Sequence, residues 1–149
     1  MFIRLIIVAF LSVINSASPA QTATYGTAAD AKAMLEKVVV AMKADPAKTI
    51  ARINKGDVEF KDRDIYPSCA GPDGKNVAHP DSTIGLVQKG IKDATGKPYG
   101  AEFASVASEG KISEVSYMYP RPGADTAPVQ KVAFVTKVAN HVCLVGYYK

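Results

Sequence analysis

The stretch that decides the fold is KDRDIYPSCAGPDGKNVAHP, residues 61–80. Residues 64–69 suit a strand, and residues 75–78 form a second short run. Between them, Pro72-Asp73-Gly74 has the chemistry of a turn, because proline presets one backbone angle and glycine accepts the positive φ that other residues resist. We therefore predict two strands joined by a tight turn. Pro67 lies inside the first strand and cannot donate to its ladder, which predicts a sheet edge or a bulge.

The first 20 residues are typical of an export signal. Arg4 precedes an apolar run, and small residues ending at Ala20 follow it, as in a secretory signal peptide. The run of about 10 apolar residues is shorter than the roughly 20 that cross a bilayer as a helix. We expect a signal peptide over residues 1–20 and a single domain over residues 21–149. An uncleaved anchor or a buried N-terminal strand is the alternative.

The two cysteines of the chain are Cys69, at the end of the first strand, and Cys143, in the last strand-like run. Export places them in an oxidising compartment, where a disulfide is favoured over a metal pair. Two buried thiols are the alternative. We predict that the first and last strands close the sheet and that a Cys69–Cys143 disulfide links them.

The charge pattern argues against a nucleic-acid partner. The 149 residues carry a formal net charge of +4, and the charges are scattered rather than grouped in basic runs with interleaved aromatic residues. We expect a soluble domain with no nucleic-acid partner and no stable membrane insertion after signal cleavage.

Helical spacing appears before the organising stretch, and strand patterns appear after it. Thr27 and Asp30 have the spacing of a capping box, followed by apolar residues on one face of a helix over residues 27–44. A second helix begins at Asp45-Pro46 and ends near Asn54 and Gly56. The remaining candidates are a helix over 98–108 and strands over 113–119, 129–138 and 142–148. Helices followed by runs of strands predict an α+β fold with an antiparallel sheet.

An ordered series of short motifs resembles a known family. The series, in chain order, is Gly26-Thr27-Ala28, residues 60–66 (FKDRDIY), Asp73-Gly74, Ala78-His79-Pro80, Gly85, Asp93 with Gly96-Lys97, Tyr117-Met118-Tyr119-Pro120 with Pro122, Lys131 and Gly146-Tyr147-Tyr148. Together these residues resemble the single Cache domain, type 2, over almost the whole of residues 25–149.

The resemblance implies a PAS-like, five-stranded antiparallel sheet with a long N-terminal helix and short covering helices. It also implies a pocket, between the sheet and the segments that cover it, for small organic molecules that are often carboxylates. In the family the domain usually lies between two transmembrane helices of a chemoreceptor or kinase. This sequence shows no second membrane segment and no signalling domain, so we expect a freestanding form, periplasmic or secreted, with a membrane receptor or kinase as a partner.

The candidate ligand-binding residues are Tyr66, Tyr117, Tyr119, Arg121, Lys131 and Phe134. Tyrosines offer apolar area and one hydroxyl, and ordinary core packing is their alternative role. Lys131 is favoured by the resemblance and Arg121 by its position, since a carboxylate ligand needs a cation; a solvated cation at a strand end is the alternative. The family usually has Tyr-x-Trp at residues 117–119 and tyrosine at Phe134, and these departures affect the expected ligand class.

Catalytic, metal and cofactor sites are not expected. His79 precedes a proline and suits a structural loop role, and no other ligand type lies at metal spacing to it. The sequence has no Gly-x-Ser-x-Gly elbow. Asp62 and Asp64 would share a strand face, but beside Lys61 and Arg63 they are interpreted as a solvated turn.

Two functions follow from these patterns. The first is an extracytoplasmic sensor domain that binds a small organic ligand, an acid, without catalysis. The second is a periplasmic interaction or adaptor protein that dimerises or docks on a membrane receptor without a small ligand. A cavity bearing Tyr117, Tyr119 and Lys131 would favour the first, and an exposed apolar stripe on the long helix would favour the second.

Overall fold

The computed structural model describes residues 24–81, 83–123 and 126–149. The signal peptide expected over residues 1–20 lies outside them. The elements are α1 (Ala28–Ala44), α2 (Pro46–Asn54), β1 (Pro67–Ala70), β2 (Asn76–Ala78), the short 3₁₀ helix η1 (Gln88–Gly90), α3 (Tyr99–Val106), β3 (Ser113–Pro120), β4 (Pro128–Val138) and β5 (His141–Tyr148). Within the described residues, these strands form one antiparallel sheet of five, which confirms the predicted α+β class. No helix in these ranges is long and apolar enough to span a membrane.

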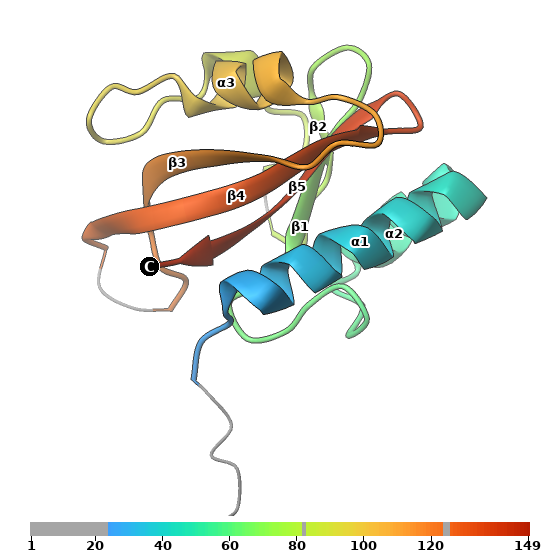
Figure 1. Cartoon of the computed structure of the whole chain (residues 1–149), viewed down its shortest axis with the longest axis horizontal. Coiled ribbons are helices and arrows are strands. Elements are labelled where there is room, and N and C mark those ends of the chain that lie inside the picture. The colour runs from blue at the N-terminus through green and yellow to red at the C-terminus, as the bar shows by residue number, and fades with distance from the viewer. Residues whose placement is uncertain (1–23, 82, 124–125) are drawn as a thin grey trace, which may run out of the picture.

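The sheet has the strand order β2-β1-β5-β4-β3. The predicted pairing of the first and last strands is confirmed, and Cys69 lies directly opposite Cys143. Their sulfurs form the predicted disulfide, with an S–S distance of 2.10 Å. The expectation that this pair closes the sheet was wrong, because β1 and β5 lie inside the sheet and β2 and β3 form its edges. After β2 the chain crosses through η1 and α3 to the far edge, and the β3–β4–β5 meander then returns to β1 (Figure 1).

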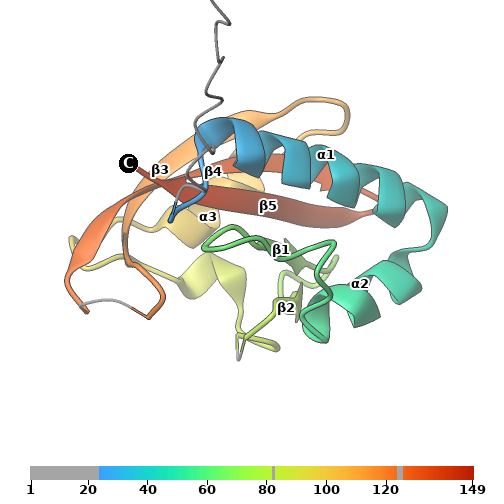
Figure 2. The same ribbon diagram turned by 90° about the horizontal axis from the view of Figure 1, so that it is seen from below.

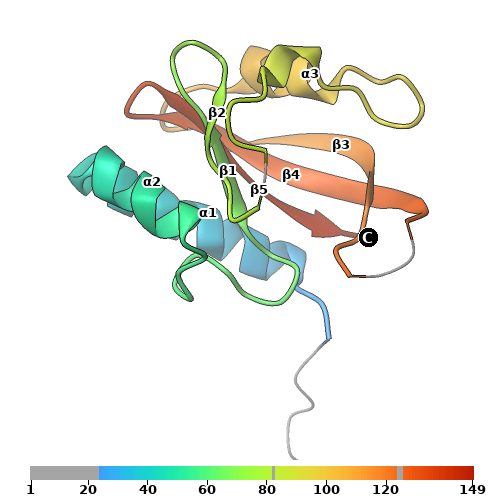
Figure 3. The ribbon, with the colours of Figure 1, turned by 180° about the vertical axis from the view of Figure 1, so that it is seen from behind.

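Helices cover both faces of the sheet. α1 and α2 lie on one face, and η1 and α3 lie on the other (Figures 1 and 3). Figure 2 shows α1 running alongside β5, which it contacts most extensively. Burial of a large aliphatic side chain contributes about 1.5–3 kcal/mol, so the apolar stripe of α1 holds this helix on the sheet. Its buried residues are Ala31, Met34, Leu35, Val38 and Met42.

The helix caps follow the sequence closely. The Asp30 amide donates to Thr27 Oγ1 at 3.2 Å, and the Thr27 amide donates to Asp30 Oδ2 at 2.8 Å, which completes the predicted capping box. Asp45 Oδ1 accepts from the Lys48 amide at 3.0 Å at the start of α2. A side-chain cap of this kind stabilises a helix by about 1 kcal/mol. The first residues of both helices are therefore set by local contacts.

Pro67 lies in β1, which is an inner strand and not the predicted sheet edge. The start of the strand nevertheless accommodates a proline. It is the first residue of β1, where it pairs with Val145 of β5. The pairing with β2 begins only at Cys69, and a register shift lies between Cys69 and Ala70. No β2 residue lies opposite Pro67. The missing N–H of the proline therefore costs the sheet no hydrogen bond to β2.

The hairpin between β4 and β5 gives a first testable prediction. Ala139 and Asn140 form its two-residue turn and have φ values of 48° and 61°. A positive φ is unfavourable for alanine and free of strain for glycine. We expect Ala139→Gly to raise the free energy of unfolding by about 0.5–1 kcal/mol, measured by urea denaturation.

The same substitution at Ala33, which is exposed in the middle of α1, is the matched control. Ala33→Gly should lower the free energy of unfolding by about 1 kcal/mol, because glycine is unfavourable inside a helix. A loss of stability in both variants would contradict the argument from the turn conformation.

Candidate functional site

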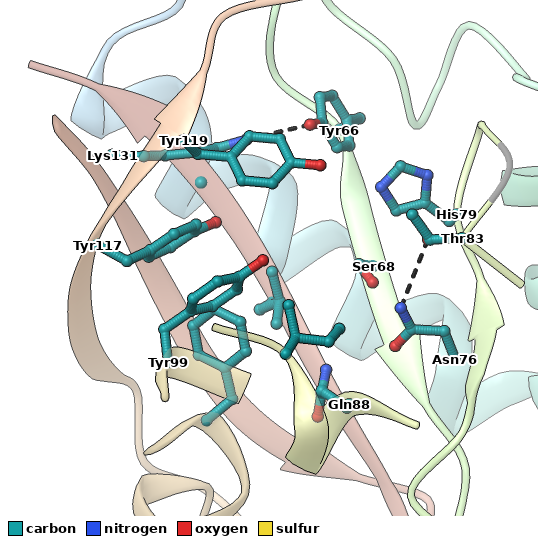
Figure 4. Close-up of a pocket in the computed structure, with 14 residues that line it drawn as sticks. Tyr66, Ser68, Asn76, His79, Thr83, Gln88, Tyr99, Tyr117, Tyr119 and Lys131 are labelled. Atoms are coloured by element: carbon teal, nitrogen blue, oxygen red, sulfur yellow. Dashed lines mark hydrogen bonds between the residues drawn. The ribbon is translucent and has the colours of Figure 1, made fainter. Parts of the chain in front are cut away.

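A cavity of about 60 Å³ lies between the sheet and the segments around η1 and α3. Figure 4 shows side chains from both layers pointing into it. The sheet face and the covering segments both contribute lining residues, which are Tyr66, Ser68, Asn76, His79, Thr83, Gln88, Ile91, Tyr99, Phe103, Tyr117, Tyr119, Lys131, Leu144 and Gly146.

Lys131 of β4 lies at one end of this cavity. Its side chain is buried, with the residue 3% exposed. The ammonium donates to the hydroxyls of Tyr66 at 3.1 Å and Tyr148 at 3.3 Å. It also lies 4.5 Å from the ring centroid of Tyr66, 4.6 Å from that of Tyr148 and 5.3 Å from that of Tyr119. Tyrosine rings and hydroxyl oxygens thus surround the cation.

Within the described residues, the partners of the Lys131 ammonium are tyrosine hydroxyls and not acidic side chains. Among the described residues, no carboxylate forms a salt bridge with it. Burial lowers its pKa to about 8, and the more distant Asp64 carboxylate partly opposes this shift. Two of the three N–H donors bind tyrosine hydroxyls, which leaves a third donor. A desolvated cation with a remaining donor stabilises an anion placed beside it.

Gly146 of β5 provides the space in which the Lys131 side chain lies. A Cβ atom at residue 146 would lie 2.5 Å from Lys131 Cε and 3.4 Å from its Cδ and Cγ. Any other residue at this position would push the end of the lysine side chain away. The absence of a side chain at Gly146 therefore sets the position of the ammonium.

Aromatic rings form one wall of the cavity. The rings of Tyr99 and Tyr117 are stacked, with centroids 4.3 Å apart and an interplanar angle of 10°. Phe103 meets both rings edge-on, with centroids 5.4 Å away in each case. Burial raises the pKa of the Tyr117 hydroxyl well above its ordinary value, so it remains a neutral hydrogen-bonding group. This cluster holds α3 against β3 and keeps the wall apolar.

Gly100 allows α3 to approach η1. A Cβ atom at this position would lie 1.8 Å from the carbonyl oxygen of Gln88. Backbone cannot move aside as a side-chain end can, so this glycine sets the separation of the two covering elements. It thereby holds Gln88 at the edge of the cavity.

The end of the cavity away from Lys131 is polar but uncharged. Asn76, Thr83 and Gln88 lie there (Figure 4). His79 lines the same cavity, its Nδ1 accepts from the Asp81 amide at 3.0 Å, and its ring meets Tyr66 edge-on. Burial lowers the pKa of His79, which keeps the ring neutral. His79 thus combines the loop role assigned to it from the sequence with a place in the cavity wall.

The structure brings four of the six sequence-predicted residues to one cavity: Tyr66, Tyr117, Tyr119 and Lys131. Phe134 lies on the other face of the sheet, where it packs in the core beneath α1 and stacks on Tyr147 at 5.8 Å. It is three residues from Lys131 along β4, and side chains an odd number of residues apart point to opposite faces. Phe134 is therefore removed from the candidate site.

Arg121 also lies outside the cavity. Its guanidinium group lies over the ring of Tyr25 at 3.8 Å and over that of Tyr148 at 4.8 Å. Its Nη1 is 4.0 Å from Asp64 Oδ2. These contacts connect the end of β3 with the segment before α1. Arg121 therefore lies next to Tyr148, which contacts Lys131, and it does not line the cavity.

The interpretation of Asp62 and Asp64 as a solvated turn holds only for Asp62, which pairs with Arg63 at the surface. Asp64 is 7% exposed, and its Oδ1 accepts from the Gly26 amide at 2.7 Å. Arg63 has a φ of 54°, so the backbone turns here and the alternation expected of a strand does not apply.

Several lining residues were not predicted from the sequence. Tyr99 opens α3 and stacks on a residue 18 positions away in the chain, which no local pattern indicates. Asn76 and Gln88 lie in short elements without periodicity. The sequence marks Gly146, and Tyr148 beside Lys131, only through the motif at residues 146–148. Their roles depend on the register of β4 and β5.

Comparison with known proteins shows the fold. No protein-family model matches the chain, and no curated protein matches it in sequence. A methyl-accepting chemotaxis protein from Vibrio parahaemolyticus RIMD 2210633 matches with a TM-score of 0.63 and 17% identity, over 80% of this chain and 86% of that chain. The periplasmic sensor domain of a chemotaxis protein matches with a TM-score of 0.58 and 21% identity, over 78% and 86%.

A third solved structure comes from work on carboxylic acid recognition by a Cache chemosensory domain. It matches with a TM-score of 0.53 and 20% identity, over 78% of this chain and 84% of that chain. At such identities the likeness is one of fold. The PAS-like fold expected from the family resemblance is therefore confirmed, whereas the type 2 assignment and the freestanding form stay predictions.

Proposed function

We propose that this chain, which has the fold of a Cache-type sensor domain, is an extracytoplasmic domain that reversibly binds a short carboxylate. The ligand carboxylate pairs with the Lys131 ammonium, and the tyrosine rings bury its carbon atoms. Binding occurs without turnover. No hydrogen bond between the described residues Ser68 and His79 supplies the nucleophile–base contact that hydrolysis needs.

The observation that carries this proposal is the buried, unpaired cation in a cavity. Placing a charge in a desolvated site is unfavourable unless an opposite charge joins it. Lys131 has hydroxyl and ring partners but no carboxylate partner in the described part of the chain. An anionic ligand supplies the missing charge, and the third N–H of Lys131 donates to it.

The size of the cavity limits the ligand. Pockets for drug-sized molecules usually measure about 300–1,000 Å³, whereas this cavity measures about 60 Å³. At roughly 10–15 Å³ for each water-sized occupant, it accepts about four to six non-hydrogen atoms. Carboxylates of two to four carbons have this size.

Export and a signalling partner belong to the same proposal. The sequence of residues 1–20 supports export, and a membrane receptor or kinase would receive the signal.

The alternative function, docking on a partner without a small ligand, has less support from the structure. The face of α1 turned away from the sheet has one large exposed apolar side chain, Val40, among its described residues. A single exposed valine is not the stripe that a helix-mediated interface needs.

Isothermal titration calorimetry of the mature, oxidised protein with acetate, propionate and butyrate tests the proposal. Propylamine, which has the size of these acids and the opposite charge, is the matched control. Binding of at least one acid and no binding of propylamine is the expected result. No binding of any short carboxylate would overturn the proposal.

The pKa of Lys131 gives a prediction for the pH dependence. Its folded-state pKa of about 8 means that the amine loses its charge above this pH. The carboxylate of the ligand stays ionised over the same range. The affinity should therefore be nearly constant below pH 7 and should fall by up to about tenfold for each pH unit above about pH 8.5. Titrations at pH 6.5, 8 and 9.5 measure this effect.

Proton uptake provides an independent check on the same group. A bound anion raises the pKa of Lys131, so binding near pH 8 should take up protons from the buffer. Titrations in two buffers of different ionisation enthalpy report this uptake. An affinity that stays equal from pH 6.5 to 9.5 would show that Lys131 is not the cation that binds the ligand.

A further inference from the structure

We infer that the pocket selects short carboxylates that carry an uncharged hydrogen-bond donor, a hydroxyl, at the end away from the carboxylate. The ligand class is therefore the short hydroxy acids. This inference rests on the proposed function, because it takes the carboxylate to lie at Lys131. The feature that carries it is the amide group of Asn76.

Asn76 has a buried acceptor without a partner. The residue is 5% exposed, and its Nδ2 donates to Thr83 Oγ1 at 3.4 Å. Its Oδ1 is fully buried and has no hydrogen-bond partner. Buried polar atoms almost always have partners, so an unpaired acceptor in a cavity wall marks a place where a water molecule or a ligand group donates a hydrogen bond.

The backbone of Asn76 does not need this side chain. The Asn76 amide donates to the carbonyl of Leu86 at 2.9 Å, and its carbonyl accepts from the Gly85 amide at 2.8 Å. These bonds hold β2 against the following loop. The side-chain oxygen therefore takes no part in holding β2 in place.

The acceptor lies across the pocket from the cation. Figure 4 shows Lys131 beside Tyr119 at one end, and Asn76 with Gln88 at the other, with the Asn76 oxygen turned toward the interior. In the inferred complex, one ligand occupies the cavity of about 60 Å³ and contacts both groups. Its carboxylate accepts from Lys131, and its distal group donates to Asn76 Oδ1.

The donor must be uncharged. None of the described residues that line the cavity is an aspartate or glutamate, and burial keeps His79 neutral by lowering its pKa. An ammonium group would enter a desolvated site without an anion and would lie in the same small cavity as the Lys131 cation. A hydroxyl donates one hydrogen bond without this penalty. The geometry therefore excludes amino acids and favours hydroxy acids.

Three ligands of nearly equal size test the inference: glycolate, propionate and glycine. They share one carboxylate and one methylene group, and they end in a hydroxyl, a methyl and an ammonium group. Glycolate should bind the wild-type protein about 10- to 100-fold more tightly than propionate, because propionate leaves the buried acceptor unpaired. Glycine should show no binding at concentrations that saturate the protein with glycolate.

Asn76→Leu removes the acceptor and keeps a side chain of similar size. This variant should lose the preference for glycolate and bind propionate at least as tightly as glycolate. The wild-type comparison needs no variant, so the test stands even if Asn76→Leu does not fold.

The outcomes separate the two proposals. Propionate binding to the wild type as tightly as glycolate, or a preference for glycolate that survives in Asn76→Leu, would overturn the inference and leave the proposed function standing. Tight binding of glycine would also overturn the inference. Failure of all three ligands to bind would overturn both.

Discussion

Removal of the Cys69–Cys143 disulfide is expected to lower the free energy of unfolding by about 4 kcal/mol. The bond joins residues 74 positions apart in the chain, and a closed loop of this length restricts the unfolded chain by roughly this amount. Both cysteines are fully buried at the centre of the sheet. In a domain of this size the corresponding decrease in melting temperature is more than about 10 °C.

The measurement compares urea denaturation of the wild type with that of the double variant Cys69→Ala, Cys143→Ala. A reducing agent should lower the stability of the wild type and leave the double variant unchanged, which controls for effects of the agent itself. Equal stability of the oxidised wild type and the double variant would show that the disulfide adds nothing to the β1–β5 pairing.

Lys131→Met is expected to reduce the affinity for short carboxylates by at least about 100-fold, since a charge-assisted hydrogen bond in a buried site is lost. Methionine has a similar length and no charge. The same variant should keep or raise the stability of the free protein at pH 7, because the folded state no longer holds a buried charge. Calorimetry and urea denaturation measure the two effects.

The pH dependence of stability identifies the same residue. The pKa of Lys131 is about 8 in the folded protein, below the ordinary value of 10.5. Between these two pH values the unfolded chain holds a proton that the folded protein has released, so stability rises with pH. The gain from this group is on the order of 3 kcal/mol across the interval, and it should be absent from Lys131→Met.

Two further substitutions separate charge from position. Gly146→Ala keeps the Lys131 charge but moves its end, so we expect weaker carboxylate binding in a folded protein. Lys137→Met removes an exposed cation from the same strand and should leave the affinity unchanged. If Lys137→Met weakened binding as much as Lys131→Met, the effect would come from net charge and not from the cavity.

The sequence predicted the elements that depend on local chemistry. The capping box at Thr27, the Asp45-Pro46 helix start and the turn at residues 72–74 are each set by neighbouring residues. The pairing of β1 with β5 was predicted from the two cysteines. The position of this strand pair inside the sheet was not predicted, because it depends on the path of the long crossover between β2 and β3.

The site was predictable where side chains alternate along strands. Tyr117 and Tyr119 share a face of β3, and Lys131 lies opposite Tyr117 in the register of β4. The same alternation should have excluded Phe134. Asn76 and Gln88 could not have been predicted, since both lie in elements too short to show a periodic pattern, and Gln88 is buried where α3 approaches η1 at Gly100.

The position of Arg121 has a mechanical consequence. The Tyr148 hydroxyl, which accepts from Lys131, donates to the carbonyl of Pro120 at 2.9 Å. The next residue, Arg121, lies over both Tyr148 and Tyr25. A continuous series of contacts therefore runs from the Lys131 ammonium through Tyr148 and Arg121 to Tyr25, just before α1. Through this series the occupancy of the cavity and the start of the long helix share the same supporting side chains.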